Sequence, residues 1–184
     1  MTNYFYMKTL VVDFNGYSPT YTHYFSKAIK DNDIEVDIIG HLNESDLNIF
    51  NELNNYIGIQ TKYKLWNYFV NWILLFSIAK NYDVIHFQWL PFLKYSSIDL
   101  ILIKLLKKKT NNIYYTVHNF TPHNCHDKTI IKRYHKLYQL IDNLIVHTSN
   151  TEDKIKALLK EQAQSKNIIK IFHGLFYSNF KLNI

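Results

Sequence analysis

The chain has 184 residues, of which 47% are hydrophobic and 16% aromatic, so one domain with a core is expected and an intrinsically disordered protein is excluded. The formal net charge is +6, but residues 1–93 carry 6 Lys/Arg against 9 Asp/Glu, whereas residues 94–184 carry 15 against 6. This basic second half indicates an anionic partner such as phosphate or a lipid headgroup, unless its lysines only form the solvated faces of helices. Nucleic-acid binding would rest on charge alone, and we do not expect it.

Three local features bear on compartment and membrane. Cys125 is the single cysteine, which excludes an internal disulfide and fits a reducing compartment. The N-terminus (MTNYFYMKTLVVDF) has the pattern of a first strand and not of a signal peptide. Residues 65–79 (LWNYFVNWILLFSIA) carry no charge, but a spanning helix needs about 20 residues. We expect an amphipathic helix there that packs in the domain or rests on a membrane surface.

Short β-rich runs alternate with longer helical stretches along the chain. In chain order we expect a strand at 9–14, a helix at 20–30, a strand at 35–39, helices at 45–54 and 63–80, a strand at 83–87, a helix at 97–108, a strand at 112–117, a helix at 128–140, a strand at 143–147, a helix at 150–159 and a strand at 167–172. The expected helix caps are Ser45, Ser96 or Ser97, and Ser149 or Asn150. This alternation predicts the α/β class: a single domain with a Rossmann-like, doubly wound parallel sheet of about six strands.

Ligands of open α/β sheets bind beyond the carboxyl ends of the strands, so the residues that follow each strand are the site candidates. After the first strand, Gly16 permits a tight turn, and the next helix directs its N-terminus, which attracts anions, to the same edge. An ordinary strand-to-helix turn is the alternative. After residues 83–87 come Gln88 and Trp89, an amide beside a flat apolar ring, which suits a sugar. Packing of Trp89 under the sheet edge is the alternative.

Residues 118–127 (HNFTPHNCHD) are the stretch richest in polar chemistry. Their histidine spacing matches no standard zinc site, and we expect no metal. We expect His118, at a strand tip, to be aimed into the cleft, where its imidazole exchanges hydrogen bonds near neutral pH. His123, His126 and Asp127 are expected to face solvent. Histidines occur in or just after four strands, each of them also compatible with a core position: His86, His118, His147 and His173.

Four blocks of sequence carry a family likeness. They are residues 82–91 (YDVIHFQWLP), 116–124 (TVHNFTPHN), 142–155 (DNLIVHTSNTEDKI) and 168–176 (IIKIFHGLF). In their order and spacing they resemble the N-terminal domain of retaining glycosyltransferases of the GT-B fold, family four. The opening segment DFNGYSPTYTHYFSKAI is similar to the first strand, glycine loop and helix of that family.

The resemblance implies roles for particular residues. In this family the N-terminal domain binds the acceptor, and the cleft between two Rossmann domains binds the nucleotide-sugar donor. It implies that Asn15 and Gly16 lie near the donor diphosphate and that His118 lies near the transferred sugar as the catalytic residue. The remaining substrate-binding residues predicted are Gln88, Trp89, Asn119, Ser149, His173 and Gly174, of which the last two would lead into the interdomain linker.

The chain also departs from the family. Its loop has one glycine where two are common, Asn124 replaces the glutamate of the PHE motif, and the donor-binding domain with its paired-glutamate motif is not present. We therefore expect residues 1–177 to be the acceptor-side domain and residues 178–184 to begin a linker or tail. A split enzyme, a truncation and a cut gene product are all compatible with this.

The sequence thus predicts a hexosyltransferase-type enzyme of polysaccharide biosynthesis that acts on a glycan or lipid-linked acceptor. It would use a nucleotide sugar as substrate, no cofactor, and a separate donor domain, and it would be inactive as the isolated chain. It would be cytoplasmic, with peripheral contact at the inner membrane face. A non-catalytic scaffold module is the alternative, and an oxidoreductase-like Rossmann domain is disfavoured because G-x-G-x-x-G is missing after the first strand.

Overall fold

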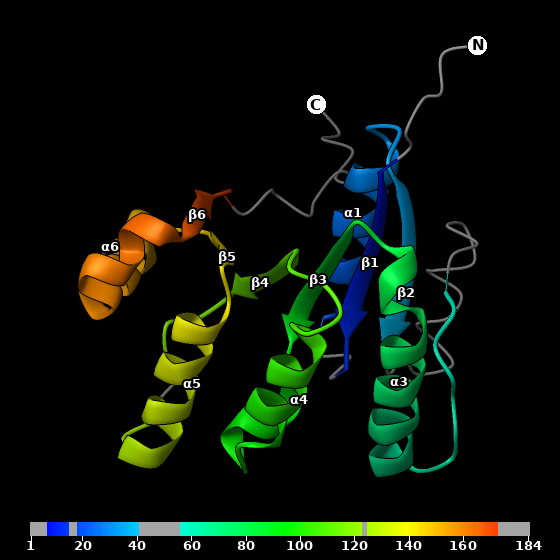
Figure 1. Cartoon of the computed structure of the whole chain (residues 1–184), viewed down its shortest axis with the longest axis horizontal. Coiled ribbons are helices and arrows are strands. Elements are labelled where there is room, and N and C mark those ends of the chain that lie inside the picture. Colours follow the sequence, from blue (N-terminus) through cyan, green and yellow to red (C-terminus); the bar gives the residue numbers. More distant parts are fainter. Residues whose placement is uncertain (1–6, 15–17, 41–55, 123–124, 173–184) are drawn as a thin grey trace, which may run out of the picture.

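The computed structural model describes residues 7–14, 18–40, 56–122 and 125–172. Their strands form one parallel sheet in the order β2-β1-β3-β4-β5-β6 (Figure 1). The strands are β1 (Lys8–Asp13), β2 (Glu35–Gly40), β3 (Val84–Trp89), β4 (Ile113–Val117), β5 (Asn143–Val146) and β6 (Asn167–Lys170). The predicted six-stranded parallel sheet is confirmed.

Helices connect the strands as right-handed parallel crossovers require. They are α1 (Pro19–Lys30), α3 (Lys64–Ile78), α4 (Ile98–Leu106), α5 (Lys128–Leu140) and α6 (Ser149–Leu159), with the short 3₁₀ helices η1 (Ala79–Asn81), η2 (Pro91–Lys94) and η3 (Lys160–Ser165). The helix predicted at residues 45–54, with Ser45 as its cap, lies outside the described residues.

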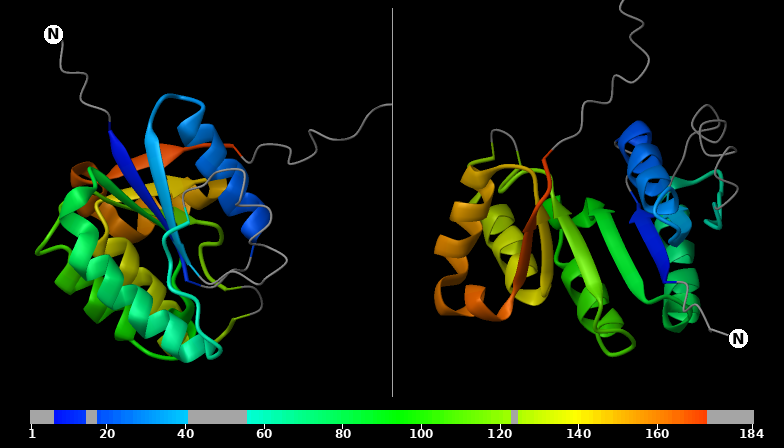
Figure 2. Two further views of the ribbon diagram at one scale, coloured as in Figure 1. Left: turned by 90° about the vertical axis from the view of Figure 1, so that its right-hand side faces the viewer. Right: turned by 90° about the horizontal axis from the view of Figure 1, so that it is seen from above.

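The helices cover both faces of the sheet, so the doubly wound fold is confirmed. On one face, Phe25 and Ile29 of α1 pack on Val11, Val36 and Ile38. On the other face α3, α4, α5 and α6 share one larger apolar core with the sheet. The views along and above the sheet show α1 alone on its side and α3 and α4 on the opposite side (Figure 2).

The winding direction reverses at β1. The chain passes from β1 outward to β2, then returns to β3 on the other side of β1 and continues in one direction to β6. The carboxyl ends of β1 and β3 therefore form the topological switch point, the place where ligands of such sheets bind. The pairing registers shift between Val12 and Asp13, opposite the end of β3, so the two strand ends there are irregular.

Aromatic side chains of α3 fix this helix to the sheet. Trp72 is fully buried, its ring centroid 5.1 Å from that of Phe14 and 5.6 Å from that of Phe87. Tyr68 packs edge-on to Phe14 at 5.5 Å. Because each buried aromatic ring removes about 150–250 Å² from water, this cluster is a large part of the core.

The two asparagines of α3 point inward. Asn71 accepts a hydrogen bond from the Ile59 amide and donates to the Ile59 carbonyl, both at 2.8 Å. Asn67 pairs in the same way with the backbone of Thr61. These side chains therefore hold the preceding segment against α3 through backbone hydrogen bonds. Among the described residues no helix is long and apolar enough to cross a membrane, the 15-residue α3 included.

Two local predictions are wrong. Gln88 and Trp89 were expected to follow the third strand, but they are its last two residues, because β3 continues alongside β1 as far as Asp13. Ser149 or Asn150 was expected to cap α6, whereas the Thr148 hydroxyl accepts from the Thr151 amide at 3.1 Å. A threonine at the N-cap bonds the third amide of the helix as serine does, so the helix starts one residue earlier.

Candidate functional site

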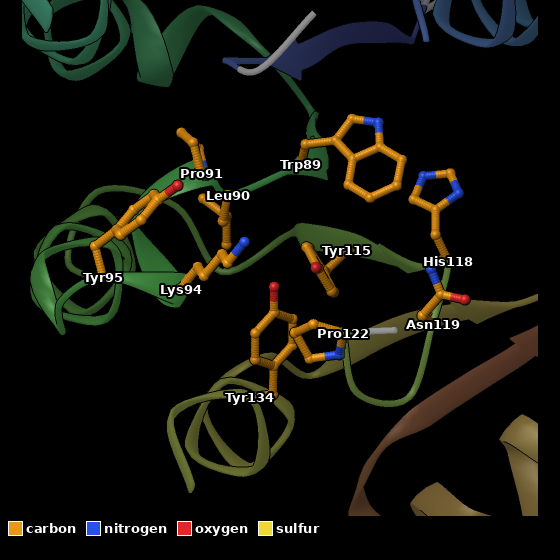
Figure 3. Close-up of a pocket in the computed structure, with 10 residues that line it drawn as sticks. All are labelled: Trp89, Leu90, Pro91, Lys94, Tyr95, Tyr115, His118, Asn119, Pro122 and Tyr134. Carbon is orange, nitrogen blue, oxygen red and sulfur yellow. The ribbon is translucent and has the colours of Figure 1, made fainter. Parts of the chain in front are cut away.

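A cavity of about 500 Å³ opens at the carboxyl ends of β3 and β4. Its walls come from the end of β3, from η2, from the loop after β4 and from α5 (Figure 3). The lining residues are Trp89, Leu90, Pro91, Lys94, Tyr95, Tyr115, His118, Asn119, Pro122 and Tyr134. Aromatic rings and polar groups both line it, and its volume lies in the usual range for a small-molecule site.

A stacked pair of rings forms one wall of the cavity. The Trp89 indole and the His118 imidazole lie with centroids 4.0 Å apart and planes 7° from parallel. Trp89 ends β3 and His118 follows the end of the neighbouring strand β4, so the two residues meet at the same edge of the sheet. The stack holds the imidazole at the cavity wall, where Figure 3 shows both rings on the same side of the opening.

Gln88 orients His118 from below. Its side chain is fully buried, and its Oε1 accepts a hydrogen bond from His118 Nε2 at 3.2 Å. The Tyr21 ring of α1 meets the same imidazole edge-on at 4.9 Å. The Nε2 of Gln88 is buried and has no hydrogen-bond partner among the described residues. An amide with an unused donor in the interior is costly, and such groups concentrate at functional sites.

The other strand histidines that the structure describes are structural. His86 Nε2 bonds the Thr116 hydroxyl at 2.7 Å, and Thr116 in turn bonds Tyr21. The Tyr21 hydroxyl lies 3.3 Å from His147 Nε2, while His147 Nδ1 donates to the Ile171 carbonyl at 2.8 Å. Burial, with a smaller contribution from His147, lowers the pKa of His86 to about 3, so His86 stays neutral. These hydrogen bonds connect α1 with β3 and β4 and with the residues that follow β5 and β6.

The rim of the cavity carries tyrosine and lysine side chains. Lys94 of η2 and Tyr95, which follows it, are exposed at one side, and Tyr134 of α5 is half-buried at the other. Tyr115 lies deeper, and burial raises its pKa well above the ordinary value, so it remains a neutral phenol. Flat rings, hydroxyls, one amide and one cation can bind a sugar ring that carries an anionic group.

The structure brings some of the predicted site residues together and separates others. Gln88, Trp89, His118 and Asn119 meet at the cavity, whereas the exposed Ser149 lies beyond the end of β5 and its hydroxyl accepts from Lys170 at 3.1 Å. Four more predicted residues lie outside the described part of the chain: Asn15, Gly16, His173 and Gly174.

The loop residues after β4 have separate roles. Asp127 is the N-cap of α5, and hydrogen bonds from the amides of Thr129 and Ile130 lower its pKa. His126 is exposed, and His123 lies outside the described residues. Within residues 7–14, 18–40, 56–122 and 125–172, no three His, Cys, Asp or Glu side chains are grouped as a metal site would require.

The sequence prediction missed the far wall of the cavity. Lys94 and Tyr95 follow β3 by only a few residues, so a wider search beyond that strand end would have included them. Tyr134 lies in the second turn of α5, and Tyr115 lies within β4. Neither position has a local signal, because only the packing of α5 against the sheet brings them to the cavity.

No protein-family model matches the sequence, and no curated protein matches it significantly. Solved structures do resemble the fold. The structure of Anabaena Alr3699/HepE in complex with UDP has a TM-score of 0.61 at 12% identity, over 92% of this chain and 44% of that one. Apo UGT2 of Phytolacca americana has a TM-score of 0.53 at 9% identity, over 91% of this chain and 52% of that one.

Both of these proteins are glycosyltransferases of the GT-B fold. The chain spans about half the length of each, so the likeness is to one of their two halves in fold. The chain therefore shares the Rossmann-like parallel α/β fold of one half of these proteins.

Proposed function

We propose that this chain is the acceptor-side half of a glycosyltransferase and that it binds a glycan or lipid-linked acceptor in the cavity at the carboxyl ends of β3 and β4. The observation that carries the proposal is the Trp89–His118 stack in the cavity wall, with Gln88 beneath it. The indole and imidazole faces match the apolar face of a sugar ring, and the nearby amide and hydroxyl groups match its hydroxyls.

His118 is the residue we assign to the reacting end of the acceptor. Its ring position is fixed on one side by Trp89, on another by Tyr21, and at Nε2 by Gln88. A fixed imidazole can exchange a hydrogen bond with an acceptor hydroxyl and hold it in reach of the donor, and such positioning is a main source of rate enhancement.

We assign the anionic part of the acceptor to Lys94, whose exposed ammonium lies at the cavity rim beside Tyr95. A phosphate or uronate next to the sugar would meet this cation, as the basic second half of the chain also favours. A glycan precursor of polysaccharide biosynthesis at the cytoplasmic side of a membrane has this chemistry.

The donor would be a nucleotide diphosphate sugar, by analogy with the UDP bound to Alr3699/HepE. On this chain we assign the donor side to Asn15 and Gly16, to Ser149, and to His173 with Gly174, which lead toward the second domain. The retaining, hexosyl-transferring route, like these assignments, rests on the sequence blocks that resemble family-four enzymes.

Transfer needs the second domain. The diphosphate leaving group must be stabilised from both sides, whereas one exposed helix N-terminus contributes about 0.3–1 kcal/mol to anion binding. Millimolar binding already requires about 4 kcal/mol. We therefore expect the isolated chain to bind nucleotide sugars more weakly than millimolar and to catalyse no transfer.

Calorimetry with two ligand panels tests the proposal. Neutral and anionic saccharides should bind the purified chain, whereas nucleotide sugars should give no measurable heat. His118→Ala should weaken saccharide binding at least about tenfold, or about 1.4 kcal/mol. Its thermal stability should not fall by a comparable free energy. His126→Ala, which removes an exposed imidazole outside the cavity, is the matched control and should bind as the wild type does.

Three outcomes decide between the alternatives. Micromolar binding of a nucleotide sugar would show that the chain holds the donor by itself and would contradict the two-domain account. Saccharide binding that survives His118→Ala but not Trp89→Ala would favour a non-catalytic binding module. No saccharide binding at all would refute the assignment of the cavity.

A further inference from the structure

The outward surfaces of α3 and α4 are apolar. Trp66 and Ile73 on α3 have 62% and 66% of their surface exposed, and Ile101 on α4 has 59%. Leu65, Phe69 and Leu105 are exposed beside them. Since Trp66, Phe69 and Ile73 are spaced three and four residues apart, they lie on one side of α3, opposite the buried Tyr68, Trp72 and Leu75. A helix of a globular domain normally places polar residues on that side.

The two helices present these residues on a common surface. They lie side by side on the same face of the sheet (Figure 1). Near their starts, the Tyr68 hydroxyl donates to Asp99 Oδ1 at 2.6 Å, and near their ends Lys109 Nζ donates to the Phe76 carbonyl at 2.9 Å. We call this the α3–α4 surface and define it as Leu65, Trp66, Phe69, Ile73, Ile101 and Leu105. Exposed apolar side chains that gather in this way mark an interaction site.

Within α3, α4 and α5, the exposed charged side chains that the structure describes are all basic. Helix α3 has no acidic residue, α5 has none, and Asp99 of α4 is fully buried. Exposed lysines are present on the same helices and at their ends: Lys64, Lys104, Lys108, Lys132 and Lys136. None of these five forms an ion pair with any residue that the structure describes. A protein partner would need a matching acidic rim, whereas an anionic bilayer offers negative charge over its whole surface.

We propose that the α3–α4 surface docks on an anionic lipid bilayer, with its apolar side chains in the interfacial region and the lysines against the headgroups. Tryptophan, phenylalanine and leucine on one side with lysines around them is the composition of helices that lie in the plane of a membrane. Lysines near an anionic surface are attracted to it, so an electrostatic contribution adds to the apolar one. The proposal stands whether or not the chain is a glycosyltransferase.

The surface adjoins the cavity. The Tyr68 ring of α3 packs against Phe92 of η2 with centroids 4.4 Å apart, and η2 also supplies Lys94 to the cavity rim. The start of α3, and with it the start of the α3–α4 surface, is therefore close to the element that supplies Lys94 to the cavity rim. If the cavity binds an acceptor, as proposed above, a lipid-linked acceptor in a docked bilayer would be close to it.

Vesicle flotation of the purified full chain tests the docking. The chain should float with vesicles of phosphatidylcholine and phosphatidylglycerol and much less with phosphatidylcholine alone. Raising the salt concentration should reduce binding without abolishing it, because the apolar contribution is not screened. The Trp66→Glu/Ile73→Glu variant should lose most binding at any salt concentration. Both positions are exposed, so equal thermal stability of this variant shows that the fold is kept.

A matched pair of charge reversals tests the lysines. Lys104→Glu/Lys108→Glu lies at the end of α4, and Lys27→Glu/Lys30→Glu lies at the end of α1, on the opposite face of the sheet. Both pairs change the net charge equally. Lys104 lies in the last turn of α4 and Lys108 just beyond its end, whereas Lys27 and Lys30 lie in the last turn of α1, where Lys27 pairs with the exposed Asp31. The α4 pair should reduce flotation with anionic vesicles at least about fivefold, whereas the α1 pair should leave it unchanged.

Equal losses from both pairs would mean that only net charge attracts the chain, and the proposed surface would be refuted. Absence of flotation with anionic vesicles would also refute it. Concentration-dependent dimerisation that Trp66→Glu/Ile73→Glu abolishes, without vesicle binding by the wild type, would identify the surface as a contact between two copies of the chain.

Discussion

The two ends of the parallel sheet differ in how their polar and charged side chains are paired. At the amino end, Lys8 bonds Glu35 at 2.6 Å and Asp37 at 3.1 Å, and its backbone amide donates to Asp83 at 2.7 Å. At the far side of the same end, Asp142 accepts from Lys107 and Lys166. Opposite charges thus pair between neighbouring elements, so these charged groups at the amino end bond one another.

At the carboxyl end the polar groups are turned toward a cavity or are buried without a counter-ion. Gln88 has an unused donor, His118 lines the opening, and Asp99, beneath η2, forms no ion pair among the described residues. Burial raises the pKa of Asp99 to about 6, whereas at the amino end the hydrogen bonds and charges of Lys107 and Lys166 outweigh burial and lower the pKa of Asp142. The comparison indicates that stability is concentrated at one end and ligand binding at the other.

The largest effect on the free energy of unfolding should come from the titration of Asp99. Because the pKa in the folded chain lies above the ordinary 3.8, the folded state holds this proton more tightly than the unfolded state does. Its contribution is therefore full below about pH 4 and is lost as the pH rises through about 6, by about 3 kcal/mol. Asp99→Asn should remove this dependence, measured by urea denaturation from pH 4 to pH 7 against the wild type. A difference between the two proteins that does not change with pH would contradict the burial argument.

Asp142→Ala should destabilise the amino end by about 1–3 kcal/mol, because it leaves the nearly buried ammonium of Lys166 with carbonyl partners only. Urea denaturation at pH 7 measures the loss, and saccharide binding at the other end should be unchanged. Asp31→Ala, which removes an exposed pair with Lys27 on α1, is the control and should cost under about 1 kcal/mol. Equal losses of unfolding free energy in the two variants would show that the ion pairs of Asp142 add no more to stability than an exposed surface pair does.

The smallest effect on stability should be that of Gln88→Leu. It removes a buried amide whose Nε2 has no described partner, so the free energy of unfolding should change by less than about 1 kcal/mol or rise. His118 loses its hydrogen-bond acceptor, so saccharide binding should fall in calorimetry. Asn143 donates to the Ile113 carbonyl at the amino end. Asn143→Leu should therefore destabilise the chain and leave saccharide binding unchanged. A loss of stability in Gln88→Leu together with a loss of saccharide binding in Asn143→Leu would contradict the assignment of binding to the carboxyl end.

The sequence predicted the fold well because periodicity reports on it directly. The helix at residues 128–140 was predicted with its observed bounds, and the charge-free segment at 65–79 was correctly assigned to a packed helix that does not span a membrane. What the pattern of α3 did not reveal is that Asn67 and Asn71 face inward while Trp66 and Ile73 face outward. Hydrophobicity alone does not tell which of two apolar sides meets the sheet.

The site was less predictable. The sequence singled out His118, but it could not exclude His86 and His147 from the site, because each of the three lies in or just after a parallel strand: His86 within β3, His118 one residue after β4 and His147 one residue after β5. The difference is depth: Thr116 and Tyr21 enclose the latter two within the fold, whereas His118 stands one residue beyond β4 against Trp89. Tyr134 reaches the cavity only through the packing of α5, which is a long-range contact without a local signal.

We propose that the chain binds its acceptor at the carboxyl end of the sheet. Its three tryptophans report on three regions: Trp89 on the cavity, Trp66 on the α3–α4 surface and Trp72 on the core. A titration of the chain with a saccharide, followed by the three indole Nε1–H signals in a nitrogen-15 NMR spectrum, therefore tests the claim most directly. The account predicts that the Trp89 signal moves with saturation while those of Trp66 and Trp72 stay in place. A Trp89 signal that does not move while another indole signal or an amino-end amide does would contradict it.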